Sequence, residues 1–177
     1  MKVEFAAAEN LSEHQEKALD QLSAAVYPPQ AEGTLPGSSI TWASPQWSIL
    51  LWEQDELVTH AGLLVREILH NGAPKRIGGI GAVATHPAQQ GRGFASQAMR
   101  EAAKRLDTDL DVAYALLFCR PDLIPFYARS QWKPFTGKVF VDQPQGKLEF
   151  TVNGAMVLDV HEQAPLEGTL DLNGLPW

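Results

Sequence analysis

The sequence is poor in three features, each of which would point to a particular class of protein. Its only cysteine is Cys119, which excludes an internal disulfide and a cluster of cysteine metal ligands. Its apolar runs are too short to span a membrane, and the N-terminal residues turn acidic before an apolar segment develops. We therefore expect a cytoplasmic protein with no signal peptide and no membrane partner. Basic residues are few, and the net charge of −7 argues against sequence-independent binding of nucleic acid, which needs a basic face.

What the sequence does contain is typical of one globular domain. Hydrophobic residues make up 45% of the 177 residues and charged residues 20%, so we expect a single domain over residues 1–177 with a sizeable core. The acidic balance is compatible with a cationic substrate. Cys119 ends an apolar run that begins at Ala115, which favours a buried core thiol over a nucleophile.

The central feature is a predicted strand, turn and helix between Gly78 and Leu106. The strand covers Ile80–Thr85, a run of small and β-branched residues suited to a buried position, and Pro87 ends it. After the turn, apolar residues recur at helical spacing and form one face: Phe94, Ala95, Ala98, Met99, Ala102, Ala103 and Leu106.

The turn between strand and helix has the chemistry of an anion site. Gly91 and Gly93 carry no Cβ, so an anion can approach the backbone closely, and Arg92 adds a formal positive charge. The start of the following helix contributes unpaired N–H groups and a partial positive charge. The alternative interpretation is a plain glycine turn before an amphipathic helix.

Three phosphate-binding patterns can be compared with this turn. A Walker loop fails, because Phe94 follows Gly93 where a lysine is required. A dinucleotide fingerprint is weak, because Ser96 occupies the third glycine position. The pattern Gln/Arg-x-x-Gly-x-Gly/Ala is met by Gln90, Gly93 and Ala95. At these residues the chain resembles the GCN5-related N-acetyltransferases, in which this turn holds the pyrophosphate of acetyl-CoA.

The remaining segments predict a mixed α+β domain. Ser12 and Gln15 form a capping box for a helix expected from Glu13 to about Tyr27. His70-Asn71-Gly72 is typical of a hairpin turn. The other expected elements are strands at Lys2–Ala7, Trp47–Trp52, Leu57–Leu69, Lys75–Thr85, Val112–Cys119, Lys138–Val141 and Lys147–Val160 (interrupted at Asn153-Gly154), a long loop over 28–46, and a short helix at about Asp122–Ser130 ended by Gln131–Pro134.

The family resemblance covers most of the chain, from about Trp47 to Trp177. It is nearest to the aminoglycoside N-acetyltransferases that act on the 2′-amine, and it lies in the segments HAGLLVREILHNG, QQGRGF and FYARSQWKPFTG. It implies an α+β fold with flanking helices and a mostly antiparallel sheet that splays between two parallel strands, here Ile80–Thr85 and Val112–Cys119. It also implies acetyl-CoA as cofactor and direct attack by a primary amine of a small, cationic acceptor. The oligomeric state is left open, with a homodimer as one option.

Carried over residue by residue, the resemblance implies a set of cofactor contacts and one catalytic acid. Val83 and Thr85 would offer backbone groups to the pantetheine arm, and the Val83 N–H would face the thioester oxygen. Tyr127 matches the family tyrosine that protonates the departing thiolate. The pyrophosphate and its neighbours would be held by Gln90, Gly91, Arg92, Gly93, Phe94, Ala95 and Ser96.

The chain departs from the aminoglycoside enzymes where the acceptor would bind. Gly81 stands in place of a glutamate that assists deprotonation, and Arg120 in place of an asparagine. Glu67 and His86 are the nearest candidate bases by sequence. The chain ends at Trp177, whose α-carboxylate is expected to face the acceptor amine, with an apolar plug as the alternative.

Two alternative functions stay open at this point. The missing glutamate at Gly81 favours an acyl-CoA-binding module with little or no catalysis. Gly79 and Gly81, being small, would leave room for an acyltransferase that uses a longer acyl chain.

Overall fold

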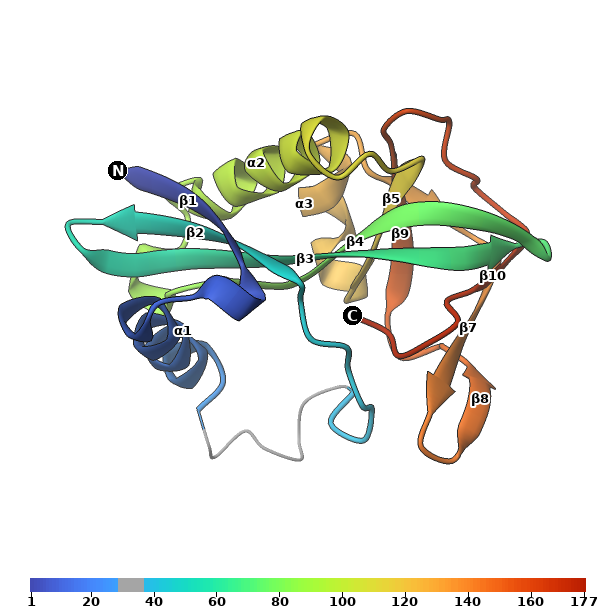
Figure 1. Cartoon of the computed structure of the whole chain (residues 1–177), viewed down its shortest axis with the longest axis horizontal. Coiled ribbons are helices and arrows are strands. Elements are labelled where there is room, and N and C mark those ends of the chain that lie inside the picture. Colours follow the sequence, from blue (N-terminus) through green and yellow to red (C-terminus); the bar gives the residue numbers. More distant parts are fainter. Residues whose placement is uncertain (29–36) are drawn as a thin grey trace.

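The computed structural model describes residues 1–28 and 37–177. Residues 29–36, part of the loop predicted over 28–46, lie outside the described residues. The rest forms one large mixed sheet, with helices α1 (Glu13–Val26) and α2 (Phe94–Thr108) on opposite sides of its first four strands (Figure 1). The predicted fold class is confirmed.

The first half of the sheet is an antiparallel meander. Strand β1 (Lys2–Ala7) pairs with β2 (Trp47–Glu53), β2 with β3 (Glu56–His70), and β3 with β4 (Ala73–Thr85). The predicted hairpin turn joins the last two strands, with φ of 48° at Asn71 and 82° at Gly72. Positive φ at both central residues matches the right-handed twist of the strands, which is why Asn-Gly suits this position.

The second half of the sheet adds six shorter strands around β3 and β4. From β6 the order runs through β9, β5, β4, β3, β10 and β7 to β8, and β5 is parallel to β4. The bounds of the remaining elements are β5 (Tyr114–Cys119), β6 (Lys133–Phe135), β7 (Lys138–Gln143), β8 (Gly146–Glu149), β9 (Gly154–Asp159), β10 (Thr169–Asp171), α3 (Ile124–Ala128) and the 3₁₀ helices η1 (Ala8–Asn10), η3 (Pro87–Gln89) and η4 (Pro121–Leu123).

The sheet opens between its two central parallel strands. Strands β4 and β5 pair only over Gly78–Ile80 and Ala115–Leu117. Beyond Ile80, β4 continues to Thr85 and β5 to Cys119 without pairing with each other. The backbone edges of both strands are therefore free along this splay, which is the feature that the family resemblance implied.

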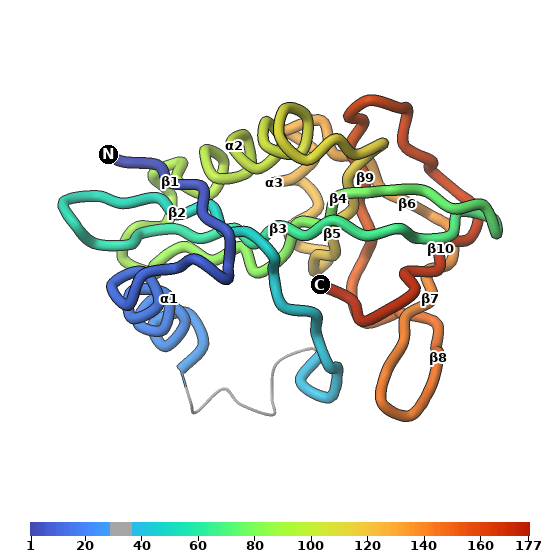
Figure 2. The backbone as a smooth tube through the Cα atoms, in the orientation of Figure 1, coloured from blue at the N-terminus to red at the C-terminus, as the bar shows by residue number. Residues whose placement is uncertain are grey.

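Apolar clusters cover the two faces of the sheet. The predicted face of α2 is buried against the sheet, and a Cβ at Gly78 would lie 2.4 Å from the Leu106 side chain, so only glycine lets this helix approach so closely. On the other face, Leu22 of α1 packs with Leu50, Trp52, Leu57 and Ala84. The tube in Figure 2 shows the C-terminal segment returning to the middle of this second face, near β4 and β5.

Three expectations about the strands after α3 were wrong. The segment expected as one interrupted strand over Lys147–Val160 is two strands with different partners, since β8 pairs with β7 whereas β9 pairs with β5 and β6. Strand β6 includes Pro134, which was expected to break structure; it lies at the sheet edge, where a missing N–H donor is tolerated. Strand β10 was not expected and pairs only over two or three residues with each neighbour.

Candidate functional site

The glycine turn presents an uncapped helix start to solvent. Gly91 and Gly93 have φ of 78° and 85°, and no atom lies within 4 Å of where a Cβ would stand on either residue. Gly93 is the N-cap of α2 and offers no side-chain hydrogen bond. The first intrahelical donor is the Gln97 N–H, at 3.1 Å from the Gly93 carbonyl, so the N–H groups of residues 94–96 have no partner within the helix.

Arg92, in the glycine turn, forms an ion pair with a carboxylate of β2. Its guanidinium makes two hydrogen bonds of 2.7 Å to the carboxylate of Glu53, at the end of β2, and lies 4.8 Å from the ring centroid of Phe94. These hydrogen bonds lower the pKa of Glu53 from its usual value. The positive charge predicted beside the glycines is therefore matched by a carboxylate. Gln90 bridges the turn to the strand end, donating to the Thr85 carbonyl at 3.4 Å.

Strand β4 carries a bulge next to the splay. The register with β3 shifts between His60 and Gly62, and Ala82 adopts φ of 50°, in the left-handed region. His86 donates its N–H to Val58 of β3 at 2.9 Å, and backbone directions alternate along a strand. The backbone groups of Thr85 and Val83 therefore point away from β3, toward the splay.

The C-terminal residue fills the space on the other side of this strand. A Cβ on Gly79 would lie 2.3 Å from the Trp177 ring, and one on Gly81 would lie 2.9 Å from the α-carboxyl carbon of Trp177. The indole donates to the Leu116 carbonyl at 3.0 Å, and the guanidinium of Arg66 lies 5.2 Å from its ring centroid. The room that the two glycines were expected to leave for a longer acyl chain is thus taken by Trp177, and that expectation is corrected.

Tyr127 is a buried residue of α3, the helix that follows β5. It belongs to the buried cluster against which Val83 packs, and only 6% of it is exposed. Burial first, then the nearby Cys119 thiol and Tyr27 phenol, raise the pKa of Tyr127 to about 12. Cys119 is buried as predicted, and burial raises the pKa of its thiol to about 11. The structure thus places Val83 and Thr85 on the splayed part of β4, Trp177 beside Gly79 and Gly81, and Tyr127 in the cluster against which Val83 packs.

The two candidate bases named from the sequence, Glu67 and His86, lie at different places on the sheet. Glu67 is exposed and pairs with Arg76, seven residues along β4 from Val83, or about 23 Å at the usual rise of a strand. The structure therefore does not bring Glu67 to the splayed part of β4. His86 lies at the turn, where its Nδ1 accepts a hydrogen bond from the Ala88 N–H at 3.2 Å and caps η3.

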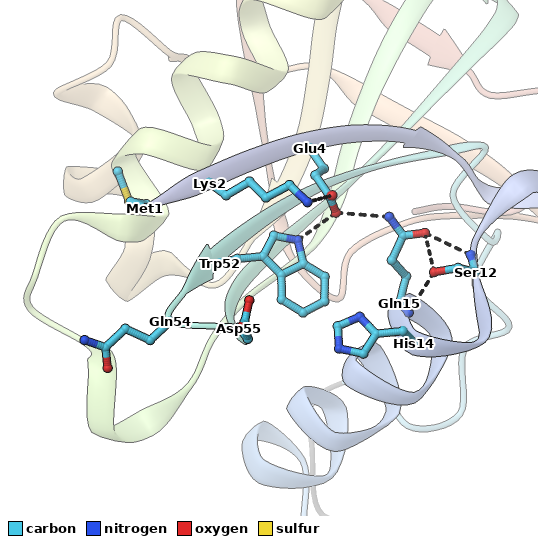
Figure 3. A pocket seen from close by; sticks show the side chains of 9 residues that line it. All are labelled: Met1, Lys2, Glu4, Ser12, His14, Gln15, Trp52, Gln54 and Asp55. Carbon is cyan, nitrogen blue, oxygen red and sulfur yellow. Dashed lines mark hydrogen bonds and ion pairs between the residues drawn. The ribbon is translucent and has the colours of Figure 1, made fainter.

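A separate pocket of about 460 Å³ lies between β1, the start of α1 and the hairpin after β2 (Figure 3). His14 stacks on Trp52 with ring centroids 5.1 Å apart, and the Trp52 indole donates to Glu4 at 2.8 Å. Glu4 also accepts from Gln15 at 3.0 Å, so these polar groups satisfy one another. None of the predicted cofactor residues lines this pocket.

Within residues 1–28 and 37–177, no group of three or more His, Cys, Asp or Glu side chains is arranged to hold a metal ion. No helix in the same residues is both long and apolar enough to cross a membrane.

Sequence reasoning missed His60, which contacts the bulge through its ring. Its Nδ1 lies 3.1 Å from the Ala82 carbonyl oxygen, and its Nε2 lies 3.0 Å from Ser48 Oγ. The only signal in the sequence was a lone histidine within the apolar run of β3.

Comparison with known proteins agrees with this geometry. Residues 10–135 match the family model described as an acetyltransferase (GNAT) domain. Among solved structures, Escherichia coli ElaA has a TM-score of 0.62 at 22% identity, with 89% of this chain and 99% of that chain covered. A GNAT family acetyltransferase from Brucella melitensis in complex with acetyl-CoA has a TM-score of 0.59 at 18% identity, covering 96% and 94%.

A third structure, the E. coli GNAT family N-acetyltransferase YhbS in complex with CoA, has a TM-score of 0.62 at 12% identity, covering 99% of this chain and 96% of that chain. At these identities the structural likenesses establish the fold alone. A comparison with curated protein sequences finds no match. The family model covers well over half of the chain, and the chain therefore belongs to the GNAT acetyltransferase family.

Proposed function

We propose that this protein is an acetyl-CoA-dependent N-acetyltransferase that acts on a primary amine of a small acceptor by direct attack. One observation carries the proposal: a bulged, splayed β4 leads straight into an uncapped helix start with two open glycines. The structures from B. melitensis and of YhbS, which hold acetyl-CoA and CoA, support the choice of cofactor.

The residues of the turn suit a pyrophosphate. The N–H groups of residues 91–96 would donate to its oxygens, because those of 94–96 have no helical partner and both glycines leave open space. Arg92 would contact the same anion while it stays paired with Glu53, so its positive charge would be divided between the two partners. Gln90 and Phe94 would shape the turn, through the Thr85 carbonyl and the Arg92 side chain respectively.

The splay suits the reacting end of the cofactor. Acetyl-CoA would supply a thioester carbonyl carbon open to attack by an amine. The backbone groups of Thr85 and Val83 would pair with the pantetheine arm, and the Val83 N–H would donate to the thioester oxygen as negative charge develops there.

Tyr127 would protonate the departing sulfur. Because its pKa is raised to about 12, the phenol stays protonated at neutral pH and is available as a donor. The amine proton would leave to water, since Glu67 is remote and Gly81 carries no carboxylate.

Trp177 would border the acceptor. Its main chain lies against Gly81, so an amine approaching the thioester from this face would meet the C-terminal segment first. The resemblance to aminoglycoside 2′-N-acetyltransferases and the net charge of −7 favour a cationic acceptor. A cytoplasmic location and a homodimer remain parts of the same proposal.

The test combines calorimetric titration of coenzyme A with release of free thiol from acetyl-CoA across a panel of primary amines. The proposal expects CoA binding and amine-dependent thiol release. The second candidate function, an acyl-CoA-binding module, is favoured by the absent carboxylate at Gly81 and would give binding with no thiol release for any amine. Absence of CoA binding would contradict both.

A further inference from the structure

We propose that His60 is a positioning residue, which fixes the bulge of β4 and thereby the direction of the Val83 N–H. The inference rests on the proposed function, because it gives that N–H its role toward the thioester oxygen. His60 lies on β3 opposite Ala84 and reaches the bulge through its side chain.

The hydrogen bonds of His60 determine its tautomer. The Ala82 carbonyl can only accept, so Nδ1 must carry the proton across the 3.1 Å contact. Nε2 is then an acceptor, and Ser48 Oγ donates to it at 3.0 Å. Only 8% of His60 is exposed, and burial lowers the pKa of its imidazole to about 4. At neutral pH the ring is therefore uncharged, with both nitrogens occupied, which suits a fixed support and leaves no free nitrogen for a base.

The bulge needs a support of this kind. Ala82 has φ of 50°, a conformation that costs free energy for a residue with a Cβ. The register shift also removes its carbonyl from the regular ladder with β3, so that oxygen needs another donor. The Nδ1–H of His60 is that donor, and it satisfies the carbonyl only while the bulge is present.

The direction of the Val83 N–H follows from the bulge. Backbone N–H and C=O groups point alternately toward and away from β3 along β4. Without the extra residue at Ala82, this alternation would shift by one residue after the bulge, and the backbone groups of Val83 would face β3 instead of the splay. A donor misplaced by about 1 Å can cost a large part of its contribution to catalysis. A side chain that locks the bulge therefore acts on the rate through Val83, without touching the reacting atoms.

The test uses four variants of the full chain. His60→Leu removes both hydrogen bonds, whereas His60→Asn keeps an N–H donor near the position of Nδ1. Ser48→Ala removes only the partner of Nε2. Ile68→Ala, at the far end of β3, serves as a control that lowers stability without contacting the bulge. The measurements are backbone amide exchange at residues 82–84 without ligand, CoA affinity by calorimetry, and the kcat and KM of thiol release.

We expect faster exchange of the Ala84 amide, which points toward β3 directly after the bulge, in His60→Leu than in Ile68→Ala. We also expect kcat to fall at least tenfold in His60→Leu while CoA affinity stays within about threefold of the wild type. His60→Asn should recover most of the lost amide protection and most of the lost kcat. The inference is overturned if exchange at Ala84 is the same in His60→Leu and Ile68→Ala, whether or not the enzyme turns over. A different outcome separates the two proposals. If exchange is faster in His60→Leu but the wild-type protein releases no thiol with any amine, the proposed function fails, whereas the role of His60 in holding the bulge is retained.

Discussion

The α-carboxyl carbon of Trp177 lies 2.9 Å from the point that a Cβ atom on Gly81 would occupy. The space beside this strand position is therefore filled by the main chain of the C-terminal segment. Arg66 holds that segment in place, donating to the Leu175 carbonyl at 2.6 Å. An acidic side chain at residue 81 and the present course of the C-terminal segment exclude each other.

Replacing Gly81 by alanine should destabilise the protein. The contact falls on backbone atoms, which cannot rotate away as the end of a side chain can, so we expect the free energy of unfolding to drop by about 1–3 kcal/mol. Gly154→Ala is the matched control, because its new Cβ would meet nothing closer than the Cys119 oxygen at 3.6 Å. Urea unfolding measures both, and equal effects at the two positions would contradict the packing of Trp177.

Replacing Gly93 by aspartate should weaken coenzyme A binding at least tenfold, or about 1.4 kcal/mol, because a carboxylate would stand at the start of α2 where the pyrophosphate is proposed. Gly72→Asp is the control for backbone strain: its φ of 82° matches the 85° of Gly93, and both positions are open. Calorimetric titration compares the two variants. If they bind coenzyme A equally well, the turn does not hold the pyrophosphate.

Replacing Glu53 by glutamine should strengthen coenzyme A binding by roughly two- to fivefold at low salt, because Arg92 would lose its carboxylate partner and face the turn as an uncompensated cation. The gain should fade toward 1 M salt, where the Debye length is about 3 Å. Asp109→Asn frees Arg105 at the opposite end of α2 and serves as control. Weaker binding in Glu53→Gln would show that the carboxylate is needed to orient Arg92.

Local signals in the sequence predicted the parts of the fold that depend on neighbouring residues. The capping box of Ser12 and Gln15, the hairpin at Asn71-Gly72 and the buried face of α2 each follow from chemistry within a few positions. The glycine turn belongs with them, since its open conformation depends mainly on two residues that lack a Cβ.

The parts of the site that sequence reasoning missed depend on contacts between distant segments. Arg92 is 39 positions from its partner Glu53, and the Trp177 indole donates to a carbonyl 61 positions away. The bulge at Ala82 has no local signature, because alanine does not favour positive φ; its support comes from His60, on another strand. Such pairings become visible only once the register of the sheet is known.

Replacing Tyr127 by phenylalanine should lower the turnover of acetyl-CoA by roughly 10²-fold while its affinity changes little, because the substitution removes one hydroxyl and almost no volume. The core around α3 should stay intact, since Tyr127 packs there through its ring. Tyr114→Phe is the control, because it removes another buried phenol from a different apolar cluster. Normal turnover in Tyr127→Phe would leave the residue with a packing role only.

The burial of His60 should make stability depend on pH in a defined window. Its pKa is lowered from 6.5 to about 4 in the folded protein, so between these values the unfolded chain binds a proton that the folded chain does not. Stability is therefore fully present above pH 6.5 and falls as the pH drops toward 4, by on the order of 3 kcal/mol in total, with a slope of about 1.4 kcal/mol per pH unit.

Carboxylates with lowered pKa, such as Glu4 and Asp159, contribute only near and below their ordinary values of 4.5 and 3.8, so the window from 6.5 to 5 reports mainly on His60. The experiment is urea unfolding of the wild type and His60→Asn at several pH values between 7 and 5. Because asparagine does not titrate, the variant should have a nearly flat profile, whatever its stability at pH 7. Parallel profiles for the two proteins would mean that the imidazole takes up its proton in the folded state, which would contradict a buried neutral ring holding the bulge.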